Sequence, residues 1–153
     1  MRAQRITTAH ALYPGACDLR DRVLLKPIGY SLERLAVEYP GCEERFEHFV
    51  ATDPEDETCV IGVVCLYPKP DAQPPEGKLM QMAVDEAWQG RGVGRVLVAE
   101  LMDRATSALG LRRVYCHARI DACKFYERLG WRYESEIFME AEIEHRVMAV
   151  GAE

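Results

Sequence analysis

The chain has 153 residues, of which 48% are hydrophobic and 29% charged, and its formal net charge is −6. A chain of this length buries about 70% of its unfolded surface, so we expect one domain over residues 1–153 with a core that needs no metal or disulfide. The composition argues against a disordered or membrane-spanning chain. The negative charge argues against non-specific nucleic-acid binding, which depends on clustered Lys and Arg.

The first third of the chain reads as two helices followed by a strand. Apolar residues spaced four, three and four apart predict an amphipathic helix over about residues 8–25, capped by Thr8. A second helix is predicted over residues 31–38, and residues 43–47 are expected to be a solvated approach to a strand over residues 48–51. The spaced apolar residues of the first helix are Leu12, Ala16, Leu19 and Val23.

The middle of the chain changes from strand to helix. A turn at Asp53–Glu57 predicts a hairpin into a β-rich run over residues 58–67, and a proline-rich loop then leads to a strand over residues 79–84. A helical period follows from Gly92 to Gly110. Its apolar stripe is formed by Val93, Leu97, Leu101 and Ala105.

The last third is predicted to be a strand over residues 113–118, a short helix that Asp121 caps and Gly130 ends, and two strands over about residues 131–138 and 143–150. The predicted order is therefore αα-βββ-α-β-α-ββ. This order indicates an α/β domain built on one mixed sheet.

The expected location follows from the lengths of the apolar segments, and the expected state of the cysteines follows from their spacing. The polar N-terminal residues lack the apolar core of a signal peptide, and the longest apolar run, Cys59–Tyr67, is too short to span a bilayer. We therefore expect a cytoplasmic protein without membrane partners. Six scattered cysteines with no C-x-x-C pair favour buried free thiols over disulfides or a metal site, and we expect no bound metal.

The segment Gln89-Gly90-Arg91-Gly92-Val93-Gly94 joins an apolar strand to the long helix. Backbone N–H groups converge at a helix N-terminus, where the helix dipole is positive, and this suits a phosphate group. The pattern alone also fits a tight turn. A nucleotide P-loop needs Lys and Ser or Thr where this chain has Arg95 and Val96, and a dinucleotide-binding loop needs glycine at Arg95, so both alternatives are poor.

Three successive segments carry a family resemblance: Leu79–Asp85, Gln89–Gly94 and Ala122–Trp131. The second matches the pattern Q/R-x-x-G-x-G/A, and the third matches A-x-x-x-Y-x-x-x-G-F/W. Together they resemble the GNAT superfamily of acyl-CoA N-acyltransferases. Softer similarity to the ElaA-like subgroup lies at residues 19–24, 48–51 and 143–148.

The resemblance implies an α/β GNAT fold and an N-acetyltransferase that uses acetyl-CoA (coenzyme A) as acyl donor. It implies direct attack by a primary amine of a small molecule or peptide in a ternary complex. It further implies that the strand at residues 82–84 splays from its neighbour to bind pantetheine, while the glycine-rich loop binds the pyrophosphate. The implied cofactor-binding residues are Met82, Ala83, Val84, Gln89, Gly90, Arg91, Gly92, Val93, Gly94, Arg95, Arg119 and Tyr126.

Amide formation from a thioester needs an acid for the departing thiolate and an acceptor for the amine proton. Tyr126 matches the family's acid, and a phenol with a pKa of about 10 suits a thiolate of similar basicity; a core aromatic residue is the simpler alternative. Relatives carry a Glu where this chain has Lys78. The candidate bases are therefore His117, Glu140 and His145.

Two departures from the family support a second hypothesis, an acyl-CoA-binding regulatory module with little transferase activity. They are Lys78 and also Arg119, which stands where relatives carry Asn or Gln and can only donate hydrogen bonds. The third hypothesis is that the domain is only a scaffold, in which the glycines form a turn. A homodimer is compatible with the sequence, which identifies neither the oligomeric state nor the amine. The acceptor pocket is expected among Arg20, Arg22, Tyr30, Glu38, Glu140 and His145, most of them exposed.

Overall fold

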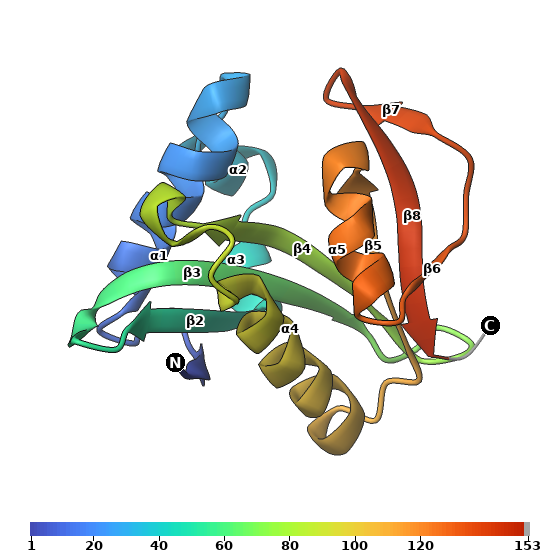
Figure 1. Cartoon of the computed structure of the whole chain (residues 1–153), viewed down its shortest axis with the longest axis horizontal. Helices are drawn as coiled ribbons and strands as arrows, with labels where there is room; N and C mark the ends of the chain where they lie inside the picture. Colours follow the sequence, from blue (N-terminus) through green and yellow to red (C-terminus); the bar gives the residue numbers. More distant parts are fainter. Residues whose placement is uncertain (152–153) are drawn as a thin grey trace.

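The computed structural model describes residues 1–151, whose strands form one eight-stranded sheet in the order β1-β2-β3-β4-β5-β8-β6, with β7 paired to β8 (Figure 1). Every neighbouring pair is antiparallel except β4 and β5, which are parallel. This mixed sheet confirms the α/β class. The strands are β1 (Ala3–Ile6), β2 (Glu47–Asp53), β3 (Asp56–Lys69), β4 (Glu76–Val84), β5 (Arg113–Arg119), β6 (Arg132–Tyr133), β7 (Phe138–Glu140) and β8 (Ile143–Gly151).

Helices cover both faces of this sheet, with α4 and α5 on one face and α1 on the other (Figure 1). Two α-helices continue into π-helical turns, since η1 (Asp21–Leu25) follows α1 and η4 (Arg104–Ala108) follows α4. Short 3₁₀ turns are η2 (Lys26–Ile28), η3 (Glu86–Trp88) and η5 (Ile120–Ala122). The α-helices are α1 (Tyr13–Arg20), α2 (Leu32–Glu38), α3 (Cys42–Arg45), α4 (Val93–Asp103) and α5 (Cys123–Arg128).

The larger core lies between α4, α5 and the sheet. The predicted stripe of α4 is buried there, with Leu97 and Leu101 fully inaccessible. Each such leucine contributes about 1.5–3 kcal/mol through burial, so the long helix is fixed by its packing more than by its intrinsic propensity. A smaller core under α1 includes Leu19 and Ala83.

The parallel strands β4 and β5 pair over only three residues. Their register begins at Glu76↔Arg113 and ends at Lys78↔Tyr115, although β4 continues to Val84 and β5 to Arg119. The two strands therefore separate beyond Lys78. This wedge leaves the facing backbone groups of β4 without a partner strand, as expected for residues 82–84.

A bulge in β4 accompanies the separation. Val63 pairs with Ala83 and Cys65 pairs with Met80. Two steps along β3 therefore correspond to three steps along β4, which holds one extra residue. Gln81 adopts a positive φ of 57° at this point. Since left-handed backbone is unfavourable for a residue with a Cβ, neighbouring contacts must fix this conformation.

Several sequence predictions were wrong in detail. The edge strand β1 was not predicted, because only Ile6 of its four residues is buried and its pairing with β2 is a tertiary contact. Thr8 does not cap α1, which starts at Tyr13 with Pro14 in its first turn, where proline is tolerated. Asp121 does not cap α5, because η5 precedes it.

Two further segments differ from the prediction. The solvated approach predicted over residues 43–47 holds for the exposed Glu44 and Arg45 but is wrong for Glu43, which lies on α3 and is only 16% exposed. The strand predicted over residues 131–138 is divided into β6 and β7, both of which pair with β8. Between them the Glu134 N–H still donates to the Val147 carbonyl at 2.9 Å, and the Glu134 side chain pairs with Arg113.

Candidate active site

A cavity of about 800 Å³ occupies the wedge between β4 and β5. This volume lies within the range of small-molecule sites. Its wall comes from both strands, from the N-terminus of α4, from α5, from the β7–β8 turn and from the segment after α1. Segments distant in the sequence therefore meet at the place where the parallel pairing stops.

The cavity connects the two faces of the sheet. Side chains alternate along a strand, and Cys116 and Ala118 of β5 pack in the α4–α5 core. His117 must therefore lie on the opposite face, whereas Tyr126 belongs to the α4–α5 core. Because both His117 and Tyr126 line the cavity, a ligand within the wedge reaches groups from either face.

The start of α4 forms one end of this cavity. Gly90 and Gly92 have φ values of 75° and 86°, and a Cβ at either residue would meet no atom within 4 Å. Within residues 1–151 the amides of Val93, Gly94 and Arg95 donate no hydrogen bond. Open backbone donors at the positive end of a helix dipole fit a pyrophosphate group.

Gly94 has a different role in the same loop. A Cβ there would lie 3.2 Å from the ring of Phe125. The absence of a side chain therefore allows α4 and α5 to approach closely across the cavity.

Tyr126 is 5% exposed and packs against Phe125 and Trp131, with ring centroids 5.0 and 4.9 Å apart. Burial, followed by the neighbouring Cys116 thiol, raises the pKa of Tyr126 well above its ordinary value. Its hydroxyl therefore stays protonated at neutral pH. A protonated phenol that lines the cavity can donate to a leaving group.

His117, Glu140 and His145, named here the open cluster, lie around the β7–β8 end of the cavity. Glu140 Oε1 is 3.0 Å from His117 Nδ1, and Glu140 Oε2 is 3.7 Å from His145 Nε2. The ring of Phe138 stands edge-on to His117 and stacks on His145. The three predicted base candidates are thus neighbours.

Hydrogen-bond partners define the histidine tautomers. His145 Nδ1 is 2.7 Å from the Ile143 carbonyl, which only accepts, so Nδ1 carries the proton. His117 Nδ1 donates to Glu140, and its Nε2 is then the proton acceptor when the ring is neutral. A carboxylate that orients an imidazole in this manner also stabilises the imidazolium.

The charge of Glu140 is maintained by its neighbours. Desolvation raises its pKa, but the hydrogen bond from His117 and the charges of His117, Lys78 and His145 outweigh desolvation, so the pKa lies below the ordinary value. Glu140 is therefore a carboxylate at neutral pH. Its side chain is 47% exposed, so solvent weakens these interactions.

The cavity contains most of the predicted catalytic and cofactor-binding residues, and Ala83 and Arg91 are the exceptions among them. Ala83 packs under α1, and Arg91 stacks on Trp88 with its guanidinium carbon 4.1 Å from the ring centroid. The predicted residues that do line the cavity are Met82, Val84, Gln89, Gly90, Gly92, Val93, Gly94, Arg95, His117, Arg119, Tyr126, Glu140 and His145.

Four of the six residues expected at the acceptor pocket lie elsewhere. Arg22 binds Asp85 and Glu86, and Tyr30 binds Glu38 on the surface. Arg20 is only 1% exposed. The side chains of Leu24, Leu25 and Ile28 line the cavity instead; their signal was an apolar run that continues past the end of α1.

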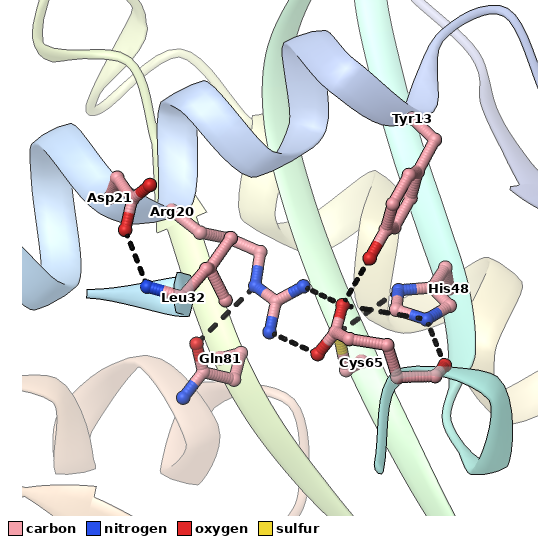
Figure 2. A network of polar contacts seen from close by, with 8 residues as sticks. Tyr13, Arg20, Asp21, Leu32, His48, Cys65 and Gln81 are labelled. Atoms are coloured by element: carbon pink, nitrogen blue, oxygen red, sulfur yellow. Dashed lines mark hydrogen bonds and ion pairs between the residues drawn. The ribbon is translucent and has the colours of Figure 1, made fainter. Parts of the chain in front are cut away.

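The buried Arg20 belongs to a second polar group, named here the closed cluster and formed by Tyr13, Arg20, Glu43 and His48. Figure 2 shows the Arg20 guanidinium between Gln81 on one side and Tyr13 and His48 on the other. Arg20 binds both carboxylate oxygens of Glu43, at 2.6 and 3.0 Å. Tyr13 donates to the same carboxylate at 2.6 Å, and His48 donates to the Glu43 carbonyl at 2.7 Å.

The closed cluster reaches β4 through the bulge. Arg20 Nε donates to Gln81 Oε1 at 3.3 Å (Figure 2). This contact from α1 holds the side chain of the residue that has the positive φ. The cluster therefore supports the wall of the cavity without lining it.

The cysteines form no disulfide within residues 1–151. Cys42, Cys65, Cys116 and Cys123 are buried as expected, Cys17 is half-buried and Cys59 is exposed, which corrects the prediction for Cys59. In the same residues no helix combines the length and apolar character that a membrane crossing requires. No three His, Cys, Asp or Glu side chains in the described part of the chain are placed to bind a metal ion.

Comparison with known proteins gives concordant matches. The model of the acetyltransferase (GNAT) family matches residues 19–131. A Bacillus subtilis (strain 168) protein assigned as an acetyltransferase is 33% identical over 72 residues, which are 47% of this chain and 48% of that protein. The match thus spans about half the length of this relative.

Solved structures share the fold. Escherichia coli ElaA superposes with a TM-score of 0.78 at 17% identity, over 97% of this chain and 99% of ElaA. An aminoglycoside 6'-N-acetyltransferase complexed with coenzyme A superposes with a TM-score of 0.76 at 13% identity, over 99% of this chain and 97% of that chain.

Proposed function

This chain belongs to the acetyltransferase (GNAT) family, and from that premise we propose that it transfers an acetyl group from acetyl-CoA to a primary amine of a small molecule or peptide. The observation that carries the proposal is the single cavity that joins three groups: the open amides at the start of α4, the hydroxyl of Tyr126 and the open cluster. Acyl transfer needs one site for the donor phosphates, one acid and one base.

The donor end is proposed at α4 and the splayed part of β4. The amides of Val93, Gly94 and Arg95 would bind the pyrophosphate, and the β4 backbone near Met82, which has no β5 partner, would bind the pantetheine arm. The neighbouring Val84 carbonyl already accepts a hydrogen bond from Gln89 Nε2 at 3.1 Å. Acetyl-CoA would supply the thioester that is attacked. Three amide donors from one rigid helix make this end complementary to an anion.

The acid is proposed to be Tyr126. As the amine nitrogen forms its bond to the acetyl carbon, the carbon–sulfur bond breaks, and the departing sulfur takes the proton of the Tyr126 hydroxyl. Its raised pKa keeps that proton available up to alkaline pH. Its packing against Trp131 fixes the ring.

The base is proposed to be His117, oriented by Glu140. The amine proton passes to His117 Nε2, because Nδ1 already donates to the carboxylate at 3.0 Å. His145 lies beside the other Glu140 oxygen, 3.7 Å from it. This pair takes the place of the family's strand glutamate, which is Lys78 in this chain.

A cytoplasmic location is part of the proposal. Its support is the set of six free cysteines, because free thiols persist in a reducing compartment.

The test uses the two halves of the reaction separately. Acetyl-CoA is expected to raise the unfolding temperature, because a ligand that binds only the native state stabilises it. A pool of primary amines is then expected to release thiol. Tyr126→Phe should lower kcat by about 10²–10³-fold while preserving the acetyl-CoA shift, and Tyr133→Phe, on the exposed β6, serves as the matched control.

Other outcomes separate the alternatives. Equal loss of turnover and of the thermal shift in Tyr126→Phe would remove the acid role. A thermal shift without thiol release for any amine would favour the acyl-CoA-binding module, for which Lys78 and Arg119 are the sequence support. Absence of any shift would overturn both.

A further inference from the structure

The acceptor end of the cavity contains a cation that the proposed reaction does not use. Lys78 belongs to the last residue pair that joins β4 to β5, so it lies at the closed end of the wedge. It is half-buried, and within residues 1–151 its side chain forms no hydrogen bond and no ion pair. A cation partly withdrawn from water gains from a counter-charge, and this one is available to a ligand.

Glu140 does not neutralise Lys78. The two oxygens of this carboxylate face His117 and His145, and the ammonium of Lys78 lies outside ion-pair distance. Lys78 acts on Glu140 only as a charge at longer range. The acceptor end thus presents a carboxylate paired with histidines and, apart from it, an uncompensated ammonium.

The positive and negative groups lie on one face of the sheet. Leu79 packs in the α4–α5 core, so alternation along β4 places Lys78 on the face that His117 occupies on β5. Lys78 is opposite Tyr115, and His117 is two residues further, or about 7 Å along the strand. A ligand that contacts both groups must carry its amine and its anion close together.

The remaining wall of this end is apolar. Leu24, Leu25 and Ile28 line it from the segment after α1, and Met80 lines it from β4. An apolar body on the acceptor would replace water against these side chains.

The charge of the cavity contrasts with that of the whole chain. Four Lys or Arg side chains line the cavity against two Asp or Glu, namely Lys78, Arg95, Arg119 and Arg128 against Asp121 and Glu140. The chain as a whole carries −6. Arg95 and Arg119 are among the residues implied to bind the donor, so Lys78 is the cation relevant to the acceptor. An acceptor with one amine and a carboxylate would complement Lys78 and the open cluster.

We propose that the acceptor is a free amino acid with an apolar side chain: its carboxylate binds Lys78, its amine faces His117, and its side chain packs on Leu24, Leu25 and Ile28. This assignment rests on the proposed acetyl transfer. It identifies the substrate class that the acceptor end recognises.

The experiment compares kcat/KM for four acceptors with acetyl-CoA: phenylalanine, phenylalaninamide, phenethylamine and spermidine. Phenylalaninamide has an uncharged amide in place of the phenylalanine carboxylate, and phenethylamine lacks the carboxylate altogether. The apolar parts of these three compounds match. We expect phenylalanine to exceed each of the other three by about 10- to 100-fold, the value of a charge-assisted hydrogen bond in a partly closed site.

Variants identify the residue responsible. Lys78→Met, which keeps the length and removes the charge, should reduce the preference for phenylalanine over phenylalaninamide to about 3-fold or less, while Lys78→Arg should retain most of it. Lys124→Met, on the exposed side of α5, is the matched control. Thermal unfolding of each variant checks that it is folded, and the wild-type comparison needs no variant.

The possible failures are distinguishable. If thiol release occurs but phenylalaninamide, phenethylamine or spermidine is used as well as phenylalanine, the amino-acid assignment is wrong and acetyl transfer stands. An unchanged preference in Lys78→Met would equally overturn it. If no amine in this set or in the wider pool gives thiol release, the proposed function fails and this inference fails with it.

Discussion

The closed and open clusters each centre on one glutamate with a histidine nearby, yet the surroundings and the other partners of the two carboxylates differ. In the closed cluster Glu43 is 16% exposed and Arg20 binds both of its carboxylate oxygens. In the open cluster Glu140 is 47% exposed, and its partners are histidines that line the cavity. A carboxylate with saturated, buried partners is a structural element, whereas one that orients a histidine beside a cavity is available for chemistry.

The difference also shows where each cluster acts. The closed cluster contacts the β4 bulge through Gln81, and within the described residues no buried side-chain polar atom lacks a partner. The open cluster leaves His117 Nε2 without a protein partner in residues 1–151. The first is therefore expected to determine stability, and the second turnover.

The largest expected effect is the loss of the closed ion pair. Glu43→Gln should lower the free energy of unfolding by about 3–5 kcal/mol, because it leaves the buried Arg20 guanidinium without a counter-charge. Chemical denaturation measures this, with the exposed Glu44→Gln as control. A decrease in the free energy of unfolding below about 1 kcal/mol would mean that water solvates the Arg20 guanidinium in the variant.

The next effect concerns turnover. Glu140→Gln should lower kcat/KM by about 10- to 100-fold, because His117 loses the carboxylate that orients and stabilises its protonated form. Its unfolding free energy should change by less than about 1 kcal/mol, since the pair is partly exposed. Steady-state kinetics with acetyl-CoA measure it, and Glu144→Gln on β8 is the control; an unchanged rate would assign the base elsewhere.

A smaller effect on the free energy of unfolding is expected when the pH is lowered. Desolvation raises the pKa of Glu43, but the bonds from Arg20 and Tyr13 outweigh it, so the folded pKa lies below the ordinary value of about 4.3. A depressed folded pKa means that this stabilisation is complete above about pH 4.3 and is lost as pH falls through the folded pKa. The stability difference between wild type and Glu43→Gln should therefore be constant from pH 7 to pH 5 and shrink at lower pH. Denaturation at a series of pH values measures it, and a difference that grows on acidification would contradict the linkage.

The smallest effect is expected at a surface Arg–Glu pair, which has the same residue types as the buried pair of Arg20 and Glu43. Arg34 Nε is 2.9 Å from Glu38 on α2, where both side chains are exposed. Arg34→Gln should leave the unfolding temperature unchanged within error, because solvent screens such pairs. A clear decrease in the unfolding temperature would show that a short ion-pair distance stabilises the fold even where both side chains are exposed.

Periodicity and turn chemistry were sufficient for much of the fold. The α4 stripe, the Asp53–Glu57 hairpin and the helix stop at Gly130 depend on residues near one another in the chain, and the structure confirms each. The pairing of β1 and the inward turn of Glu43 depend on distant partners. No local pattern encodes them, so neither could be predicted from the sequence.

The same division applies to the candidate site. Motifs and residue chemistry are local, so the amino-acid sequence was enough to predict the family, the glycine-rich loop and the candidates Tyr126, His117, Glu140 and His145. The three-dimensional arrangement was needed to show that these groups share one cavity, that Arg20 is a buried support, and that the Lys78 side chain has no partner within residues 1–151. The physical reason is the wedge: where β4 and β5 separate depends on packing across the whole sheet, and that separation brings the two faces together.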